Sequence, residues 1–249
     1  MKDAVTSAVK QGPRSYQEDR HFFAPIEGSR SCGWFLAVMD GHAGDAVAEL
    51  CAQEIGQIFQ SFVAGNTEEA LRLLVAELNS RTQKNRQGST LSIAVVTDDP
   101  CKVSVAVIGD SPVVVYDKQG KLHLSPEHNV RSNLKERAAA IGRGGRYAEG
   151  YLFARGNYSG LQMGRALGDA DLDEVLSREP DIYTVHDPRW VLVASDGLFD
   201  PNHEDMPKLL GQIKRYAKKR ADAESLMKWA ERRGLEDNAT AIVWCADTK

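Results

Sequence analysis

The sequence predicts an α+β fold in which two antiparallel sheets are stacked and helices pack on their outer faces. Three observations support this prediction. Many apolar runs show the alternation and β-branching of strands, two pairs of helical segments interrupt them, and the order is strands, two helices, strands, two helices and a last strand. This order differs from the regular strand–helix alternation that indicates a parallel sheet.

The first half of the chain is expected to contain most of the strands. Alternating polarity or a continuous apolar run marks each one. They are expected at Ala4–Lys10, Arg20–Ala24, Gly33–Met39, Thr90–Thr97, Lys102–Ile108, Val113–Asp117 and Lys121–Leu124. Two helices divide this series: Ala43–Phe62 has one apolar stripe, and Thr67–Arg86 begins at a capping pair formed by Asn66 and Glu69.

The second half is expected to contain more helix. A short helix is predicted at Arg131–Ile141, where Gly142 ends it. Residues 142–162 are rich in Gly, Arg and Tyr and have no clear period, which predicts a loop or flap with at most one short strand. The last expected elements are a strand at Arg189–Ala194, helices at Glu204–Lys218 and Ala221–Arg233, and a strand at Ala239–Cys245.

Length and composition indicate one globular unit. The chain has 249 residues, of which 42% are hydrophobic, and no linker rich in Pro, Gly or Ser divides it, so we expect a single domain over residues 1–249 and a monomer. The net charge of −4 is too small to indicate a nucleic-acid or acidic-membrane partner. Since no apolar stretch is long enough to span a bilayer and the N-terminus has no signal core, we expect a cytoplasmic protein.

Four short acidic motifs are the most informative feature of the chain. They are Arg-Ser-Tyr-Gln-Glu-Asp at 14–19, Val-Met-Asp-Gly-His-Ala-Gly at 38–44, Ala-Ser-Asp-Gly-Leu-Phe-Asp at 194–200 and Glu-Asp-Asn-Ala-Thr at 236–240. A buried strand that stops at an Asp-Gly places a carboxylate at the edge of the core. Several carboxylates converging there would repel one another, and a divalent cation would keep them ionised. Oxygen ligands with few His and no Cys favour Mg²⁺ or Mn²⁺ over zinc.

The ordered motifs resemble those of a known family. The four acidic motifs are similar to the signature of the metal-dependent type 2C serine/threonine protein phosphatases. Four further blocks match between them: Gly88-Ser89-Thr90, Gly109-Asp110-Ser111, Arg165-Ala166-Leu167-Gly168-Asp169 and Glu179-Pro180-Asp181-Ile182. The match runs in order over almost the whole chain, from about Val5 to Trp244. A single Asp-Gly is common in turns, whereas this ordered set of eight is specific.

The resemblance implies a fold and a cofactor. The fold would be a four-layer αββα sandwich, with two central antiparallel sheets flanked by helix pairs, in agreement with the order of elements above. Two Mg²⁺ or Mn²⁺ ions at one end would activate a bridging hydroxide that attacks phosphorus in line. By position in the motifs, Asp40 would bridge both ions, Glu18, Asp196 and Asp237 would complete the ligands of one, and the Gly41 carbonyl would bind the other.

The resemblance also implies roles for residues that hold no metal. Arg14 would bind the phosphate, because a guanidinium fork matches two phosphoryl oxygens. His42 would act as the general acid that protonates the leaving serine or threonine oxygen. Asp19 would act through a metal-bound water or by positioning His42. Arg165 and Asp169 could also be functional, but from the residues alone a structural ion pair is the favoured interpretation.

A third, weaker metal site is a further expectation. Asp110 and Asp200, together with Asp196, match such a site in some members of the family. From the residues alone, a metal ligand and a turn residue are equally good interpretations of Asp110 and Asp200. Pro112 stands where the family has an Arg, which alters the turn that carries Asp110.

Two functions are compatible with these motifs. The first is metal-dependent hydrolysis of phosphoserine and phosphothreonine, with phosphorylated proteins as substrates. The second is a pseudophosphatase that uses the fold as a binding module. Pseudophosphatases typically lack a metal carboxylate, and here all of them are present, so the sequence favours the enzyme.

Overall fold

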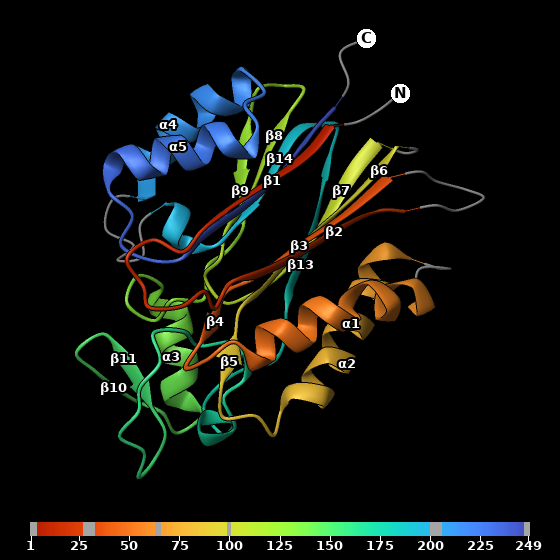
Figure 1. Ribbon diagram of the computed structural model, residues 1–249. Helices are drawn as coiled ribbons and strands as arrows, with labels where there is room; N and C mark the ends of the chain where they lie inside the picture. Colours follow the sequence, from red (N-terminus) through yellow and green to blue (C-terminus); the bar gives the residue numbers. More distant parts are fainter. Residues whose placement is uncertain (1–3, 27–32, 63–65, 99–100, 200–205, 247–249) are drawn as a thin grey trace.

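Two five-stranded antiparallel sheets lie face to face in the computed structural model, with a pair of helices on each outer face (Figure 1). The structure describes residues 4–26, 33–62, 66–98, 101–199 and 206–246. In the first sheet the strand order is β1 (Ala4–Lys10), β15 (Ala239–Cys245), β14 (Pro188–Ala194), β8 (Val113–Asp117) and β9 (Leu122–Leu124). In the second sheet it is β13 (Asp181–His186), β7 (Cys101–Ile108), β6 (Leu91–Asp98), β3 (Gly33–Met39) and β2 (Arg20–Ile26).

The helices cover the outer faces in pairs, so the predicted four-layer αββα sandwich is confirmed. Helices α1 (Ala46–Phe62) and α2 (Thr67–Thr82) pack on the second sheet, and α4 (Met206–Lys218) and α5 (Ala223–Arg233) pack on the first (Figure 1). The Asn66 side chain caps α2 by accepting a hydrogen bond from the amide of Glu68, as the capping pair predicted. None of the helices in the described residues is long and apolar enough to cross a membrane.

The core between the two sheets consists mainly of β-branched side chains. Strands buried on both faces favour such residues because their branched side chains pack well on a pleated surface. Its largest members include Leu36, Val38, Val103, Val105, Val191, Val193, Ile242 and Trp244. This continuous apolar layer gives β3, β14 and β15 a rigid base from which polar loops project at one end of the sandwich.

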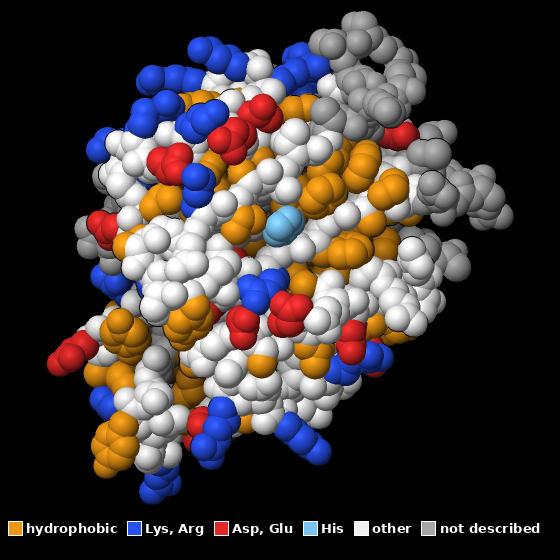
Figure 2. All heavy atoms as spheres, in the orientation of Figure 1, with side chains coloured by type: hydrophobic (Ala, Val, Ile, Leu, Met, Phe, Trp, Pro, Cys, Tyr) orange, Lys and Arg blue, Asp and Glu red, His pale blue; other side chains and the backbone are white. Residues whose placement is uncertain are grey.

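Basic side chains gather on the helix layer that covers the first sheet. Figure 2 shows Lys and Arg side chains gathered over the part of the molecule that α4 and α5 form. Arg215, Lys218 and Lys219 are exposed there, and Lys228 of α5 forms an ion pair with Glu224 one turn earlier. These basic residues therefore belong to a solvated helix face.

A small subdomain lies beside the sandwich and forms the flap. It contains α3 (Leu134–Gly142) and a hairpin of β10 (Arg146–Ala148) and β11 (Tyr151–Phe153), with its own apolar cluster around Val130, Leu152 and Val175. The prediction of at most one short strand in residues 142–162 was therefore wrong. Strands of three residues are too short to show a period in the sequence.

Several other elements were not predicted. Strand β13 is the edge of the second sheet, and most of its side chains are half-buried, which weakens the alternation that marks a strand. A three-stranded sheet of two-residue strands joins β12 (Leu167–Gly168), β5 (Gly88–Ser89) and β4 (Gly41–His42). Most other predicted elements occur within three residues of their expected bounds, although α2 ends earlier, at Thr82.

Candidate active site

A cavity of about 380 Å³ opens at the end of the sandwich where the loops after β1, β3 and β14 meet the flap. Eight of the predicted site residues line it: Arg14, Glu18, Asp40, Gly41, His42, Asp110, Asp196 and Asp237. Asp19 lies behind this lining and is buried. Asp200 falls outside the described residues, so its predicted role is a sequence expectation only.

The backbone around Asp40 is held by the segment that follows α2. Asp40 follows β3, and its amide donates to Thr90 Oγ1 at 3.0 Å while the amide of Thr90 donates to the Asp40 carbonyl at 2.9 Å. Gly41 comes next, and a Cβ there would lie 2.7 Å from the Glu18 carbonyl oxygen, so only glycine allows the two segments to approach this closely. Thr90 is thus a positioning residue that the sequence offered only as part of a matching block.

Asn238 connects the loop of Arg14 and Glu18 to the loop before β15. Its Oδ1 accepts from the amide of Glu18 at 2.8 Å, and its Nδ2 donates to the carbonyls of Gln11 at 2.7 Å and Tyr16 at 3.2 Å. Both functions of the amide side chain are used, and Asn238 is buried. In the sequence, its place in a motif beside Asp237 was the only signal of this role.

The carboxylates in and behind the cavity raise one another's pKa values. Burial, and then the charges of Asp19, Asp196, Asp110 and Asp237, raise the pKa of Asp40 well above its usual range. Burial raises the pKa of Asp19 to about 6, although the nearby hydroxyl groups of Thr240 and Ser195 oppose this shift. Such a concentration of acidic groups without a neutralising charge is unfavourable in the ionised state.

The donor set fits hard divalent cations, although no site is preformed. In the part of the chain that the structure describes, no group of three or more Asp, Glu, His or Cys side chains is arranged to hold an ion. The lining nevertheless offers carboxylate oxygens from Glu18, Asp40, Asp196 and Asp237, and Oδ1 of the buried Asp19 has no hydrogen-bond partner among the described residues. Carboxylates that repel one another at close range are suited to Mg²⁺ or Mn²⁺.

Arg14 is the cationic group at this carboxylate cluster. Its Nη2 lies 2.5 Å from Oδ2 of Asp237, and the Arg14 side chain is half exposed. Burial raises the pKa of Asp237 above its usual value, and the Arg14 guanidinium opposes part of this shift. Since Asp237 is also an expected metal ligand, ion binding would compete with Arg14 for this carboxylate and release the guanidinium toward the cavity.

Asp110 remains in the cavity despite the unusual Pro112. Its Oδ2 accepts a hydrogen bond from Asn129 Nδ2 at 2.8 Å, and the side chain is buried. The Pro112 carbonyl accepts from the amide of Ala194, so the proline extends the pairing of β8 with β14 and leaves the preceding turn in place.

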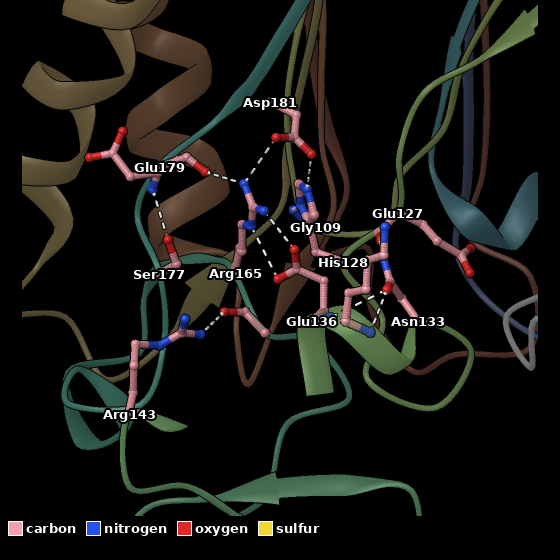
Figure 3. Close-up of polar contacts among 12 residues, drawn as sticks. Gly109, Glu127, His128, Asn133, Glu136, Arg143, Arg165, Ser177, Glu179 and Asp181 are labelled. Atoms are coloured by element: carbon pink, nitrogen blue, oxygen red, sulfur yellow. Dashed lines mark hydrogen bonds and ion pairs between the residues drawn. The ribbon is translucent and has the colours of Figure 1, made fainter. Parts of the chain in front are cut away.

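A buried polar network supports this turn from the side of the flap (Figure 3). The amide of Gly109 donates to Nδ1 of His128 at 3.0 Å, and Nε2 of His128 lies 3.0 Å from Asp181. Arg165 forms a bidentate pair with Glu136 of α3 and also contacts Asp181 (Figure 3). Arg165 thus has the structural role expected of it, but its partner is not Asp169.

Asp169 contacts His42 instead. Nε2 of His42 lies 3.0 and 2.8 Å from the two carboxylate oxygens of Asp169. Asp19, which was expected to act through a metal-bound water or on His42, accepts a hydrogen bond from Ser195 Oγ at 2.8 Å. The structure thus gives His42 a different acidic partner.

The flap contributes the wall opposite the carboxylates. Tyr151 and residues 160–163 line the cavity together with Glu236 from the loop before β15. The sequence offered no period from which these flap residues could be assigned to the site.

Comparisons with known proteins agree with this geometry. The sequence profile described as Protein phosphatase 2C matches residues 4–239. A protein kinase and PP2C-like domain-containing protein of Arabidopsis thaliana is 30% identical over 251 residues, which cover 93% of this chain and 37% of that protein. Protein phosphatase 2C homolog 2 of Schizosaccharomyces pombe is 32% identical over 217 residues, which cover 76% and 56%. The chain therefore spans about a third to just over half of the length of these two relatives.

Solved structures share the fold. The serine-threonine phosphatase 2C from Toxoplasma gondii superposes with a TM-score of 0.72 at 20% identity, covering 98% of this chain and 94% of that one. A sex determining protein of C. elegans superposes with a TM-score of 0.79 at 24% identity, covering 98% and 65%. Since the family profile extends over nearly all of the sequence, the chain belongs to the protein phosphatase 2C family.

Proposed function

We propose that the protein is a metal-dependent phosphatase that hydrolyses phosphoserine and phosphothreonine in proteins. The observation that carries this proposal is the half-buried Asp40 in the cavity wall, whose pKa is raised by burial and by the charges of four neighbouring aspartates. A fold keeps such a cluster only where something compensates for the repulsion, and divalent cations do so with these donors. Family membership makes phosphate-ester hydrolysis the reaction to test first.

The expected metal ligands in the lining each have a defined task in this proposal. Asp40 would contact two ions, Glu18, Asp196 and Asp237 would complete the protein ligands of one, and the Gly41 carbonyl would serve the other. When bound, the ions would activate the water that attacks phosphorus. The backbone contacts of Asp40 with Thr90 would fix where its carboxylate enters the cavity.

Arg14 would hold the substrate phosphate, and His42 would protonate the leaving serine or threonine oxygen. Arg14 lines the cavity and lies at the rim, where its guanidinium can turn from Asp237 to a phosphate dianion. A serine or threonine alkoxide is a poor leaving group, so a proton from His42 lowers the barrier as the P–O bond breaks. The flap residues opposite would contact the polypeptide that carries the phosphate.

Removal of divalent metal is expected to abolish activity. Turnover of p-nitrophenyl phosphate and of a phosphothreonine peptide should vanish in EDTA and return with excess Mn²⁺ or Mg²⁺, because the carboxylates alone cannot activate water. Ca²⁺ should bind but support little turnover, since its looser coordination places the nucleophile poorly.

The same assay separates the enzyme from the binding module. Full activity after metal removal would contradict the metal-dependent reaction. No turnover of either substrate at any metal concentration, with metal binding still detected by calorimetry, would identify a pseudophosphatase.

Asp110→Asn tests the third metal site. The amide can still accept the hydrogen bond from Asn129, so the change removes the charge and retains the contact. If Asp110 binds a third ion, kcat should fall and the half-maximal metal concentration should change, while calorimetry still shows the two tighter ions. Asp98→Asn, at the exposed end of β6, is the control. Wild-type kinetics at every metal concentration would make Asp110 a turn residue.

A further inference from the structure

His42 and Asp169 form a pair that the expected roles of the motifs do not explain. Both carboxylate oxygens of Asp169 lie within hydrogen-bond distance of Nε2 of His42, at 3.0 and 2.8 Å. Asp169 is buried, and Nδ1 of His42 is buried with no hydrogen-bond partner among the described residues. Nε2 of His42 therefore has a partner in Asp169, whereas Nδ1 has no partner among the described residues.

The three-stranded sheet of β4, β5 and β12 builds this pair. His42 is opposite Gly88 in the pairing of β4 with β5, and Gly168, which precedes Asp169, is opposite the same glycine in the pairing of β12 with β5. A Cβ at Gly88 would lie 2.1 Å from Asp169 Oδ2 and 2.2 Å from His42 Nε2. The glycine thus leaves the space in which the carboxylate and the imidazole meet.

The backbone of Asp169 is held in an unusual conformation. Its φ of 52° lies in the left-handed region, which residues other than Gly adopt rarely and Asp and Asn tolerate best. The amide of Asp169 donates to the Gln87 carbonyl at 3.0 Å, and the Asp169 carbonyl accepts from Leu172 at 2.8 Å. These contacts therefore hold the Asp169 backbone in a strained conformation that directs its side chain at the His42 ring. Strained backbone conformations of this kind are common at functional sites.

We propose that Asp169 is a positioning residue that holds His42 through Nε2–H and leaves Nδ1 as the nitrogen that serves the substrate. This inference deepens the proposed function and rests on it for the role of His42. As the P–O bond breaks, the Nδ1–H bond breaks and a new O–H bond forms on the departing serine or threonine oxygen. The ring keeps its Nε2–H in contact with Asp169, so it returns to the neutral state in a single defined tautomer.

The kinetic arm compares two leaving groups. Asp169→Asn is the variant of choice, because Asn tolerates the same backbone conformation and the change removes the charge and replaces one acceptor oxygen by a donor amide group. His42→Ala should lower kcat/KM for a phosphothreonine peptide by about 10²–10⁴-fold and have little effect on p-nitrophenyl phosphate, whose leaving group needs no proton. Asp169→Asn should show the same selectivity with a loss of about 10–100-fold.

Two further variants separate positioning from structure. If Asp169 acts through His42, the double variant His42→Ala/Asp169→Asn should lose no more than His42→Ala alone. Asp171→Asn is the matched control, because Asp171 lies two residues away, is half exposed and contacts Arg86. Equal losses on both substrates for Asp169→Asn, or losses that add in the double variant, would overturn the inference.

A spectroscopic arm reads the ring without reference to turnover. ¹⁵N spectra of the full chain with Mg²⁺, at a pH where the ring is neutral, distinguish the two tautomers, and the signal missing in His42→Ala identifies His42. We expect the proton on Nε2 in the wild type and a mixture of tautomers in Asp169→Asn. A wild-type ring protonated on Nδ1 would overturn the inference. If the ring behaves as expected but His42→Ala affects both substrates equally, the proton-transfer part of the proposed function fails and the positioning by Asp169 stands.

Discussion

Asp40→Asn is expected to lower kcat by several orders of magnitude and to stabilise the metal-free protein. The activity should fall because the change removes the charged ligand expected to contact both ions. The stability should rise because burial and the neighbouring aspartates raise the pKa of Asp40 in the folded state. The stability that a raised carboxyl pKa contributes is present below the unfolded pKa and is lost as the pH rises through the folded pKa, so the ionised Asp40 destabilises the fold at neutral pH.

Thermal unfolding in two conditions measures this effect. In EDTA at about pH 8, Asp40→Asn should melt above the wild type, and the difference should shrink as the pH falls toward the unfolded pKa of an aspartate. With excess Mg²⁺ the order should reverse, because the ion binds and stabilises the folded wild type. Asp98→Asn is the control and should melt with the wild type in both conditions. Near-normal turnover of Asp40→Asn at saturating metal would contradict the ligand assignment.

Asn238→Ala should both destabilise the protein and inactivate it. The change removes the acceptor for the Glu18 amide and the donors to the Gln11 and Tyr16 carbonyls. Because Asn238 is buried and loses three part-buried hydrogen bonds, we expect the free energy of unfolding to fall by about 2–4 kcal/mol. The loop that carries Arg14 and Glu18 would lose its connection to Asp237, so kcat/KM should fall even at temperatures where the variant is folded.

Asn66→Ala is a matched control for this variant. Asn66 caps α2 by accepting from the amide of Glu68, away from the cavity, and its loss should lower the free energy of unfolding by about 0.5–2 kcal/mol without changing kcat/KM. Chemical denaturation and initial rates on p-nitrophenyl phosphate provide both measurements. If Asn238→Ala loses stability but retains wild-type kinetics when folded, Asn238 is a structural residue only.

The layers of the fold were predictable from the sequence because burial leaves a clear pattern. Gly33–Met39 is continuously apolar because β3 lies between a helix layer and the other sheet, and that pattern identified it as a strand buried on both faces. The sheet edge β13 and the short strands of the flap were missed, because half-buried or very short strands show no strong alternation.

The site was predictable to the extent that its residues occur in motifs. Eight of the predicted residues line one cavity, although they come from distant parts of the chain. The contacts between these residues were not predictable. Asp169 approaches His42 only because Gly88 leaves room between them, and Asn238 reaches Glu18 across more than two hundred residues of sequence. Such contacts depend on tertiary packing, which a single sequence does not record.

The position of β15 in the first sheet has a consequence for biosynthesis. This strand lies between β1 and β14, so two strands from opposite ends of the described chain become neighbours. During translation, β1 is synthesised before β15, its neighbour in the sheet. Until β15 pairs with it, β1 exposes an unpaired strand edge that can cause aggregation. Arg14 and Glu18 follow β1, and Asp237 precedes β15. A nascent chain is therefore expected to remain inactive until β15 has been synthesised and inserted, and a chaperone that shields β1 until then should raise the yield of folded protein.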